Sequence, residues 1–262
     1  MISVIMGIYN CENTLSDSID SLLSQTYKDF EIIMCDDGST DKTFEIAKKY
    51  ADTHDNIILL KNDKNRGLNY TLNYCLKFAH GEFIARHDGD DISLPDRFEK
   101  EMEILNASPS LSFVASNAIF FDEKGEFRTS KYKEYPEKVD FIHGSPFVHP
   151  TCIFRKSILN DVDGYSESNR LLRVEDYHLF FKIYAKGKRG INIQEPLYRF
   201  RDNFFSYKRR NFRSRLNEVY VRFIGFRMLK LPFYCYIFCI RPLLVLLLPA
   251  FVYNYFHRRN KL

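Results

Sequence analysis

Short apolar runs alternate with longer amphipathic runs along the first third of the chain. Four short runs rich in Ile, Val and Leu have the length and β-branched content of buried parallel strands. They cover residues 2–8, 30–35, 57–60 and 82–86, while helical spacing of apolar residues marks 14–25, 44–50 and 67–79. This alternation with short connections predicts a doubly wound α/β domain, in which helices flank a mostly parallel sheet.

The pattern becomes less regular beyond residue 90. Ser93 suits a helix N-cap and Pro95 suits a first helical turn, so we expect a helix to begin there. Residues 128–145 mix polar and aromatic side chains and support no assignment. The remaining pattern predicts strands at 111–121 and 147–155, a turn at 123–125 and a helix at 175–186.

Acidic and polar residues follow several of the predicted strands directly. In doubly wound sheets, ligands bind beyond the carboxyl ends of the strands, so these residues are expected to converge on one rim. They are Asn10, Asp36, Asp37, Asp88, Asp90 and Asp91.

The three aspartates at 88, 90 and 91 are the strongest local signal. Carboxylates this close repel one another unless a cation lies with them. Oxygen ligands suit Mg²⁺ or Mn²⁺, whose coordination shells substrate phosphates commonly complete. A solvated acidic turn is the alternative, because Asp-Gly is a common turn pair. Convergence with the acids at the other strand ends favours the metal site.

Three further clusters each admit a functional and a structural interpretation. Carboxylates of Asp36 and Asp37 could accept hydrogen bonds from a uracil ring or ribose hydroxyls, or could form only a turn with a helix cap. Arg66 could reach a phosphate or a base, with Gly67 allowing close backbone approach, or could be an ordinary surface arginine. The acids at 175–176 could include a general base, or could simply complement the dipole of the predicted helix.

Three more residues are weaker candidates. His149 lies in an apolar run, where a histidine is more often structural than catalytic, and we retain it as a candidate for the acceptor site. Arg199 and Arg201 begin a basic segment and could supply positive charge to a leaving diphosphate.

Charge is distributed unevenly along the 262 residues. Residues 199–262 carry fourteen Lys and Arg against two acids, whereas residues 1–198 carry 24 basic and 32 acidic side chains. An acidic body with a basic tail suggests that the tail meets an anionic surface.

The six cysteines show no metal-site or disulfide spacing, which favours a reducing compartment. The N-terminus enters a strand without a basic leader, so we expect no secretion signal.

Several motifs, taken in order, resemble those of inverting, nucleotide-sugar-dependent glycosyltransferases of family 2, which have the GT-A fold. The resemblance covers about residues 1–205, which we expect to form the catalytic domain. The motifs are Ser3-Val4-Ile5-Met6-Gly7-Ile8-Tyr9-Asn10, Asp36-Asp37-Gly38-Ser39-Thr40-Asp41, Asn65-Arg66-Gly67-Leu68, Ala85-Arg86-His87-Asp88-Gly89-Asp90-Asp91, His149-Pro150-Thr151, Asp163-Gly164-Tyr165, Glu175-Asp176-Tyr177 and Tyr198-Arg199.

The resemblance implies a role for most of these residues. Asp176 would be the catalytic base, with Glu175 as the alternative. Mn²⁺ or Mg²⁺, bound by Asp90 and Asp88, would neutralise the departing diphosphate. The deprotonated acceptor hydroxyl would attack the anomeric carbon from the opposite face, which inverts the configuration. The residues expected to bind the nucleotide sugar, with UDP as the expected nucleotide, are Tyr9, Asn10, Asp36, Asp37, Asn65, Arg66, Gly67, Arg86, Asp88 and Gly89.

The chain departs from the family pattern at two positions. Gly7 stands where the first strand commonly has Pro, and Arg201 stands where a His often follows the Tyr-Arg pair. The chain also has no Trp, so it lacks the Gln-x-x-Arg-Trp motif of processive polymer synthases. We therefore expect transfer of a single sugar.

The C-terminal residues 206–262 are expected to associate with a membrane. Residues 208–230 interleave basic and apolar side chains as in a basic amphipathic helix, and residues 231–256 are largely apolar. Arg241 and interior prolines favour attachment in the plane of the inner leaflet over a bilayer span. A buried C-terminal helical hairpin is the structural alternative.

The sequence therefore favours a glycosyltransferase at the cytoplasmic face of the cell membrane. It would extend a glycan or a polyprenyl-diphosphate-linked acceptor in cell-surface polysaccharide synthesis. A sugar nucleotidyltransferase is the alternative enzyme, but the turn after the first strand lacks glycine. A basic nucleic-acid-binding protein is the non-enzymatic alternative; the acidic body argues against it, and we expect no nucleic-acid partner.

Overall fold

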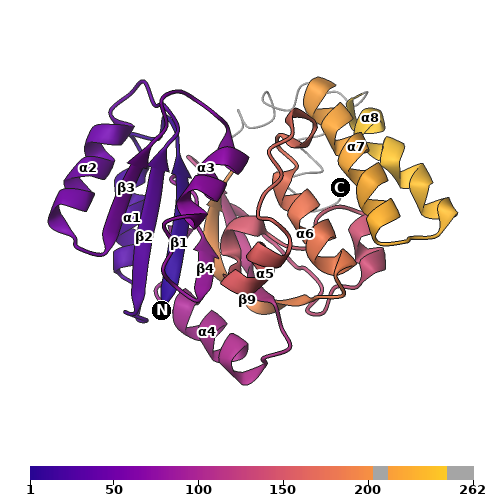
Figure 1. Cartoon of the computed structure of the whole chain (residues 1–262), viewed down its shortest axis with the longest axis horizontal. Helices are drawn as coiled ribbons and strands as arrows, with labels where there is room; N and C mark the ends of the chain where they lie inside the picture. Colours follow the sequence, from indigo (N-terminus) through magenta and orange to yellow (C-terminus); the bar gives the residue numbers. More distant parts are fainter. Residues whose placement is uncertain (203–211, 247–262) are drawn as a thin grey trace.

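One mixed sheet with helices on both faces forms the body of the protein in the computed structural model, which describes residues 1–202 and 212–246 (Figure 1). The strands are β1 (Ile2–Ile8), β2 (Phe30–Asp36), β3 (Ile57–Lys61), β4 (Phe83–Arg86), β5 (Ile92–Ser93), β6 (Phe113–Asp122), β7 (Gly125–Thr129), β8 (Ile153–Arg155) and β9 (Gly190–Arg201).

Helices connect and cover these strands. The α-helices are α1 (Leu15–Leu23), α2 (Thr43–Thr53), α3 (Leu68–Leu76), α4 (Arg97–Ala107), α5 (Lys156–Asp161), α6 (Glu175–Ala185), α7 (Phe212–Met228) and α8 (Arg241–Leu246). Short 3₁₀ helices are η1 (Lys138–Ile142), η2 (His149–Thr151), η3 (Asn169–Leu171) and η5 (Phe233–Ile240).

The first half of the sheet confirms the predicted alternation. β1 lies between β2 and β4 and pairs with both in parallel, and β2 pairs in parallel with β3. Every side chain of β2 is buried, as expected for a strand covered on both faces. α1, α2 and α3 occupy the connections that the helical spacing predicted.

The second half corrects the expectation of a mostly parallel sheet. β8 is antiparallel to both β4 and β6, and β5 is antiparallel to β9, whereas β6 and β9 run parallel. The long strand β9 had no counterpart in the sequence pattern. Its many contacts are with β6, far away in the chain, and local periodicity carries no information about such a pairing.

Two local predictions were also wrong. The strand predicted at 147–155 is present only at its end, because His149–Thr151 forms a 3₁₀ turn around Pro150, which has no N–H for a ladder. Ser93 does not cap a helix. It pairs with β9 as part of β5, and α4 begins only at Arg97.

Successive side chains of β1 point to opposite faces of the sheet, and each face has its own apolar core. Ile5 points to a core shared with α3, α6 and α7. Val4 and Met6 point to the other face, where α1, α2 and α4 cover the sheet. The sheet is therefore buried on both sides and presents its functional groups only at strand ends and loops.

The described part of the C-terminal segment differs from the predicted basic amphipathic helix. Within α7, Arg215 and Arg222 are buried while Phe223 is exposed. Arg222 donates to the Ile142 carbonyl at 2.8 Å, and Gly225 packs so closely that an added Cβ would lie 2.3 Å from the Phe181 ring. α7 thus packs on α6.

η5 and α8 fold back against α7 at the end of the molecule far from α2 (Figure 1). No helix within residues 1–202 or 212–246 combines the length and apolar character needed to cross a bilayer. Residues 203–211 and 247–262, which include parts of the predicted basic and apolar stretches, lie outside the described residues.

Candidate active site

The carboxyl ends of β1, β2 and β4 meet at one rim of the sheet, as predicted. Ile8 at the end of β1 is in register with Asp36, and Ile5 with Arg86. The loop that follows β4 folds against the end of β1, because a Cβ on Gly89 would lie 3.1 Å from the Ile8 side chain. The acidic segments after β2 and β4 therefore flank the end of β1.

Asp37 holds two loops of this rim together. Its buried carboxylate accepts hydrogen bonds from the backbone N–H groups of Arg66 at 2.8 Å and Gly67 at 2.9 Å, and from the Asn62 amide at 2.8 Å. Gly38 allows the loops to approach, since its φ is +75° and a Cβ would lie 2.8 Å from the Asn65 nitrogen. Asp37 thus positions the Asn65–Gly67 turn.

Asn10 joins the end of β1 to the turn after β2. Its side-chain oxygen accepts from the Thr40 N–H at 2.9 Å, and its own N–H donates to the Ser39 hydroxyl at 3.1 Å. Asp36 accepts from the Ser39 N–H at 3.3 Å. Tyr9, the residue before Asn10, is 47% exposed, so its ring can offer a flat apolar face at the rim.

Arg66 directs its side chain away from Asp37. The guanidinium pairs with Asp63, with Nε 2.9 Å from Oδ1, and lies over the Tyr70 ring with its central carbon 4.9 Å from the centroid. Only its backbone N–H faces Asp37. The side chain instead forms one wall of a neighbouring pocket.

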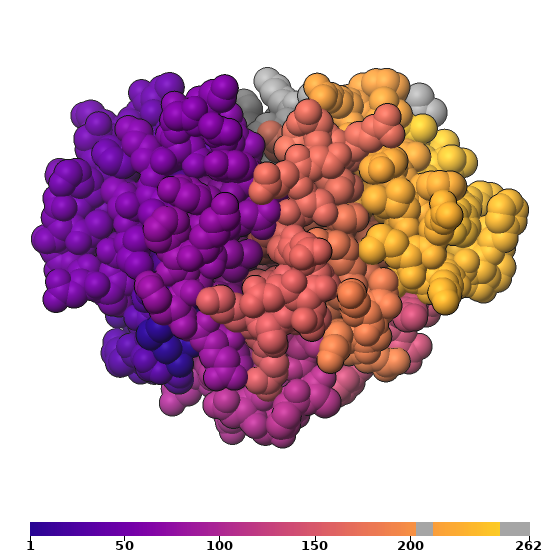
Figure 2. All heavy atoms as spheres, in the orientation of Figure 1, coloured from indigo at the N-terminus to yellow at the C-terminus, as the bar shows by residue number. Residues whose placement is uncertain are grey.

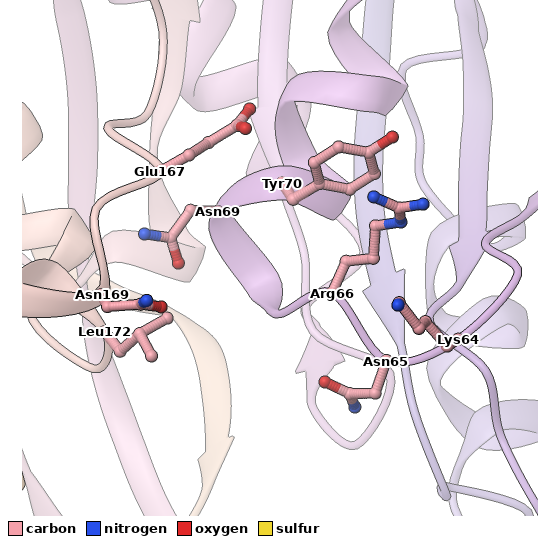
Figure 3. Close-up of a pocket in the computed structure, with 8 residues that line it drawn as sticks. All are labelled: Lys64, Asn65, Arg66, Asn69, Tyr70, Glu167, Asn169 and Leu172. Atoms are coloured by element: carbon pink, nitrogen blue, oxygen red, sulfur yellow. The ribbon is translucent and has the colours of Figure 1, made fainter.

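That pocket, of about 240 Å³, lies between α3 and the loop that leads to α6 (Figure 3). Gly67 lies close to Leu172, since a Cβ added to Gly67 would be 3.6 Å from the Leu172 side chain. The pocket is therefore beside the turn that Asp37 holds. Its lining is rich in amides and basic groups: Lys64, Asn65, Arg66, Asn69, Tyr70, Glu167, Asn169 and Leu172.

α1 fixes the backbone of the aspartate loop after β4. The Ser18 hydroxyl donates to the Asp88 carbonyl at 2.8 Å, and the Thr14 hydroxyl donates to the Gly89 carbonyl at 3.0 Å. His87, fully buried, makes a 3.0 Å contact between Nε2 and the same Ser18 hydroxyl. The loop is therefore held from its inner side by a helix that precedes it by seventy residues.

β9 holds the same loop from the other side. The Arg201 N–H donates to Asp91 Oδ1 at 2.7 Å, and its Nε donates to the Asp90 carbonyl at 2.9 Å. The Tyr198 hydroxyl accepts from the Asp88 N–H at 3.3 Å. Arg201 therefore places a fixed positive charge beside the aspartates.

The donor set of this loop fits a hard divalent cation. Asp91 is buried, and its Oδ2 has no hydrogen-bond partner within the described part of the chain. Burial and the nearby charges of Asp90 and Asp88 raise its pKa well above the usual range. Hard oxygen donors of this kind suit Mg²⁺ or Mn²⁺.

These side chains do not complete a metal site alone. Among residues 1–202 and 212–246, no three His, Cys, Asp or Glu side chains are grouped so that they could hold an ion. A cation at Asp88 and Asp90 would therefore need further oxygen ligands from a substrate or from water, as Mg²⁺ commonly does.

Arg86 is the buried cation at the centre of the site. Its Nη2 lies 2.5 Å from Asp88 Oδ1, and it also donates to the His87 carbonyl. Its positive charge lowers the pKa of both Glu175 and Asp176, although their pKa values remain raised overall. The guanidinium, which is 1% exposed, thus pairs with the aspartate loop and also acts electrostatically on the acids at the start of α6.

Glu175 and Asp176 begin α6 in an environment that favours their neutral forms. Burial, followed by the charge of Asp176, raises the pKa of Glu175 to about 7. Burial also raises the pKa of Asp176, against hydrogen bonds from backbone N–H groups. Arg173, just before the helix, has a φ of +66°, a strained backbone of the kind concentrated at functional sites.

His149 is buried, and its environment favours the neutral imidazole. Burial and the charge of Arg86 lower its pKa well below the usual range. Its Nε2 is 2.8 Å from the Tyr165 hydroxyl, whose pKa burial raises. The structure therefore places His149 in the support of the site, with 6% of its surface exposed.

Arg199 is directed elsewhere. Its Nε lies 3.2 Å from Glu126 Oε1 on β7, and its guanidinium lies over the Phe121 ring. Of the two arginines predicted to face a diphosphate, Arg201 is the one that contacts the aspartate loop.

Sequence reasoning missed the buried polar support of the loop. Arg97 and Glu101, both fully buried, pair at 3.2 Å, and Arg97 donates to the Arg86 carbonyl and lies over the Tyr198 ring. A charged pair four residues apart on the same helix as the apolar Phe98 and Met102 was the available signal.

Comparison with known proteins is consistent with this geometry. The model of "Glycosyl transferase family 2" matches residues 3–163. The Bacillus subtilis protein named "Putative glycosyltransferase EpsE" is 41% identical over 260 residues, which cover 99% of this chain and 94% of EpsE.

A second relative has a more specific name. The Escherichia coli protein WfaP, a UDP-Glc:α-D-GlcNAc-diphosphoundecaprenol β-1,3-glucosyltransferase, is 32% identical over 201 residues, or 76% of this chain and 77% of WfaP. Among solved structures, the mannosyltransferase PcManGT of Pyrobaculum calidifontis, in complex with GDP-Man and Mn²⁺, is similar with a TM-score of 0.67 and 19% identity. That match covers 97% of this chain and 78% of PcManGT.

Proposed function

Because the chain belongs to glycosyltransferase family 2, we propose that it transfers one sugar, with inversion, from a nucleotide-diphosphate sugar to an acceptor hydroxyl. The observation that carries this proposal is the arrangement around Arg86. Asp88 pairs with this buried cation. The positive charge of Arg86 also lowers the pKa values of Glu175 and Asp176 at the start of α6. A candidate leaving-group site and a candidate base are therefore coupled electrostatically through this cation.

The nucleotide would bind at the rim beside β1 and β2. Tyr9 and Asn10 would line the base and ribose on one side, with Asp36 and Asp37 below them. The backbone of Asn65–Gly67, fixed by Asp37, would approach from the other side. UDP is the proposed nucleotide, supported by the donor named for WfaP.

The diphosphate would lie over the aspartate loop. Asp90 and Asp88 would hold Mn²⁺ or Mg²⁺ together with phosphate oxygens, and the Mn²⁺ named for PcManGT supports this assignment. When bound, the ion supplies positive charge that stabilises the departing diphosphate. Arg201 adds a fixed charge at the same loop, because its Nε is anchored on the Asp90 carbonyl.

Asp176 would act as the general base, with Glu175 as the alternative. Its carboxylate would take the proton from the acceptor hydroxyl while that oxygen bonds to the anomeric carbon. The bond from this carbon to the diphosphate oxygen breaks on the opposite face, so the configuration inverts. Arg86 would keep the base ionised despite its burial.

The acceptor would be a glycan or a polyprenyl-diphosphate-linked sugar used in cell-surface polysaccharide synthesis. The lipid-linked substrate named for WfaP supports this class. We place the enzyme at the cytoplasmic face of the cell membrane, where such an acceptor and a nucleotide sugar can meet. The exposed basic residues Arg227 and Lys230, near the end of α7, support attachment there.

Slow hydrolysis of donors, with water as acceptor, tests the proposed function. Purified protein incubated with UDP-, GDP- and TDP-sugars is expected to release a nucleoside diphosphate from one donor class. Chelation of divalent ions should lower that rate at least tenfold, because several kcal/mol of leaving-group stabilisation are removed. A lack of release from every donor, or a rate unaffected by chelation, would contradict the proposal.

The partly buried acids at the start of α6 predict a pH dependence. A base works in its ionised form, and the pKa values at Glu175 and Asp176 are raised, so activity should be full at alkaline pH and lost as pH falls. Below the apparent pKa of the pair, which we expect between the ordinary carboxyl value and about 7, kcat/KM should fall about tenfold per pH unit. A profile measured at saturating Mn²⁺ that stays flat down to pH 4 would exclude this base.

A further inference from the structure

A row of exposed apolar side chains runs along η5 and α8. Phe233 is 90% exposed, Tyr234 71% and Ile237 68%, and Ile240 and Leu244 are also exposed. We refer to these five residues as the apolar ridge. Soluble proteins rarely leave so many large apolar side chains together on the surface unless they contact a partner or a membrane.

The ridge is one side of a folded segment and not a frayed end. On its inner side, Cys235, Cys239 and Pro242 are buried against α7 and its neighbours. Arg241 fixes the junction of η5 and α8, since its Nη1 donates to the His143 carbonyl at 2.9 Å. In Figure 2 this segment forms the outer edge of the molecule, at the end away from the N-terminal strands.

All formal side-chain charges near the ridge in sequence are positive. From Val219 to Leu262 the chain contains no Asp or Glu, and exposed Arg227 and Lys230 lie just before η5. A second copy on the ridge would bring like charges together across a two-fold contact. The chain's own residues 247–257 carry no formal charge, and Arg258, Arg259 and Lys261 follow them. Anionic lipid is the occupant that complements both the apolar and the positive character.

We propose that the apolar ridge lies in the plane of an anionic membrane, with Phe233, Tyr234 and Ile237 inserted at the boundary of headgroups and acyl chains. Arg227 and Lys230 would contact the anionic headgroups. The inference deepens the proposed function, since it identifies the surface that brings the enzyme to a lipid-linked acceptor. It requires no membrane-spanning helix.

Vesicle flotation of the full chain tests the proposal. Vesicles of phosphatidylcholine with 30% phosphatidylglycerol should bind the protein at least tenfold more tightly than phosphatidylcholine alone, as expected for about 1 kcal/mol per basic residue at the surface. Phe233→Glu should lower partitioning to the anionic vesicles at least tenfold. Phe78→Glu, the same change at an exposed Phe beyond the end of α3, should leave partitioning unchanged.

The absence of Trp from the chain allows a direct probe of the ridge. Phe233→Trp should fluoresce as an exposed indole in buffer and shift to the blue when anionic vesicles are added. Emission that is already blue-shifted in buffer would mean that the chain's own residues cover the ridge. A dimer in sedimentation that Phe233→Glu dissociates would mean that a second copy does; either result overturns the proposal.

Donor hydrolysis separates this inference from the proposed function. Because Phe233 is remote from the rim of the sheet, Phe233→Glu should hydrolyse the donor at the rate of the unaltered chain. Intact hydrolysis without vesicle binding would overturn the inference alone. Vesicle binding without hydrolysis of any donor would overturn only the proposed enzymatic function.

Discussion

Asp176→Asn is expected to lower kcat for sugar transfer by roughly 10²- to 10⁴-fold, the usual contribution of a positioned general base. The substitution keeps the shape of the side chain and its contact with the Tyr177 N–H at the start of α6. It removes only the capacity to accept a proton. The donor KM should change little, because Asp176 is not among the residues proposed to bind the donor.

Glu175→Gln provides the matched control at the neighbouring position. We expect a smaller loss, since Asp176 remains able to take the proton. If Glu175→Gln instead abolishes transfer while Asp176→Asn does not, the roles of the two residues are exchanged. Equal activity of both variants and the unaltered enzyme would exclude a base at the start of α6.

Asp90→Ala is expected to reduce kcat/KM at least 100-fold, corresponding to a loss of about 3 kcal/mol of leaving-group stabilisation. The backbone of the loop should persist in the variant, because Arg201 contacts the Asp90 carbonyl and Ser18 contacts the Asp88 carbonyl. The loss should therefore come from the side chain, and raised Mn²⁺ should recover only part of it.

Mn²⁺-dependent binding of the nucleoside diphosphate, measured by calorimetry, gives a readout independent of turnover. Asp90→Ala should abolish the dependence of binding on Mn²⁺, whereas Asp55→Ala, an exposed acid at the start of β3, should retain it. Unchanged Mn²⁺ dependence in Asp90→Ala would remove Asp90 from the proposed metal site.

The positions of the catalytic candidates show how separate parts of the chain build one site. The aspartate loop is held by α1 on one side and by β9 on the other. Arg86 pairs with Asp88 of this loop, and its positive charge also lowers the pKa of Asp176 in α6. Substitutions in α1 or β9 would therefore act on the proposed metal site without touching a ligand.

Local patterns of apolar and polar residues predicted most of the first half of the fold. The strands β1 to β4 and the helices between them follow directly from runs of apolar residues and helical spacing, and their acidic ends converge as parallel strands require. The same reasoning failed after residue 90, where it missed β9 and misplaced the start of α4. Antiparallel insertion of β8 and the pairing of β6 with β9 depend on contacts between distant segments.

The sequence alone determined the family, the order of the strands and helices up to β4, and the acidic identity of the loop at Asp88–Asp91. Each of these depends on residue types and short spacings, which are local properties. Tertiary structure decided the surroundings of the individual side chains. Asp37 accepts hydrogen bonds that hold the Asn65–Gly67 turn, and Arg86 is a buried cation that pairs with Asp88. Phe233 is an exposed apolar side chain. Burial and partners change pKa values and bonding capacity, and they arise only when distant segments pack together.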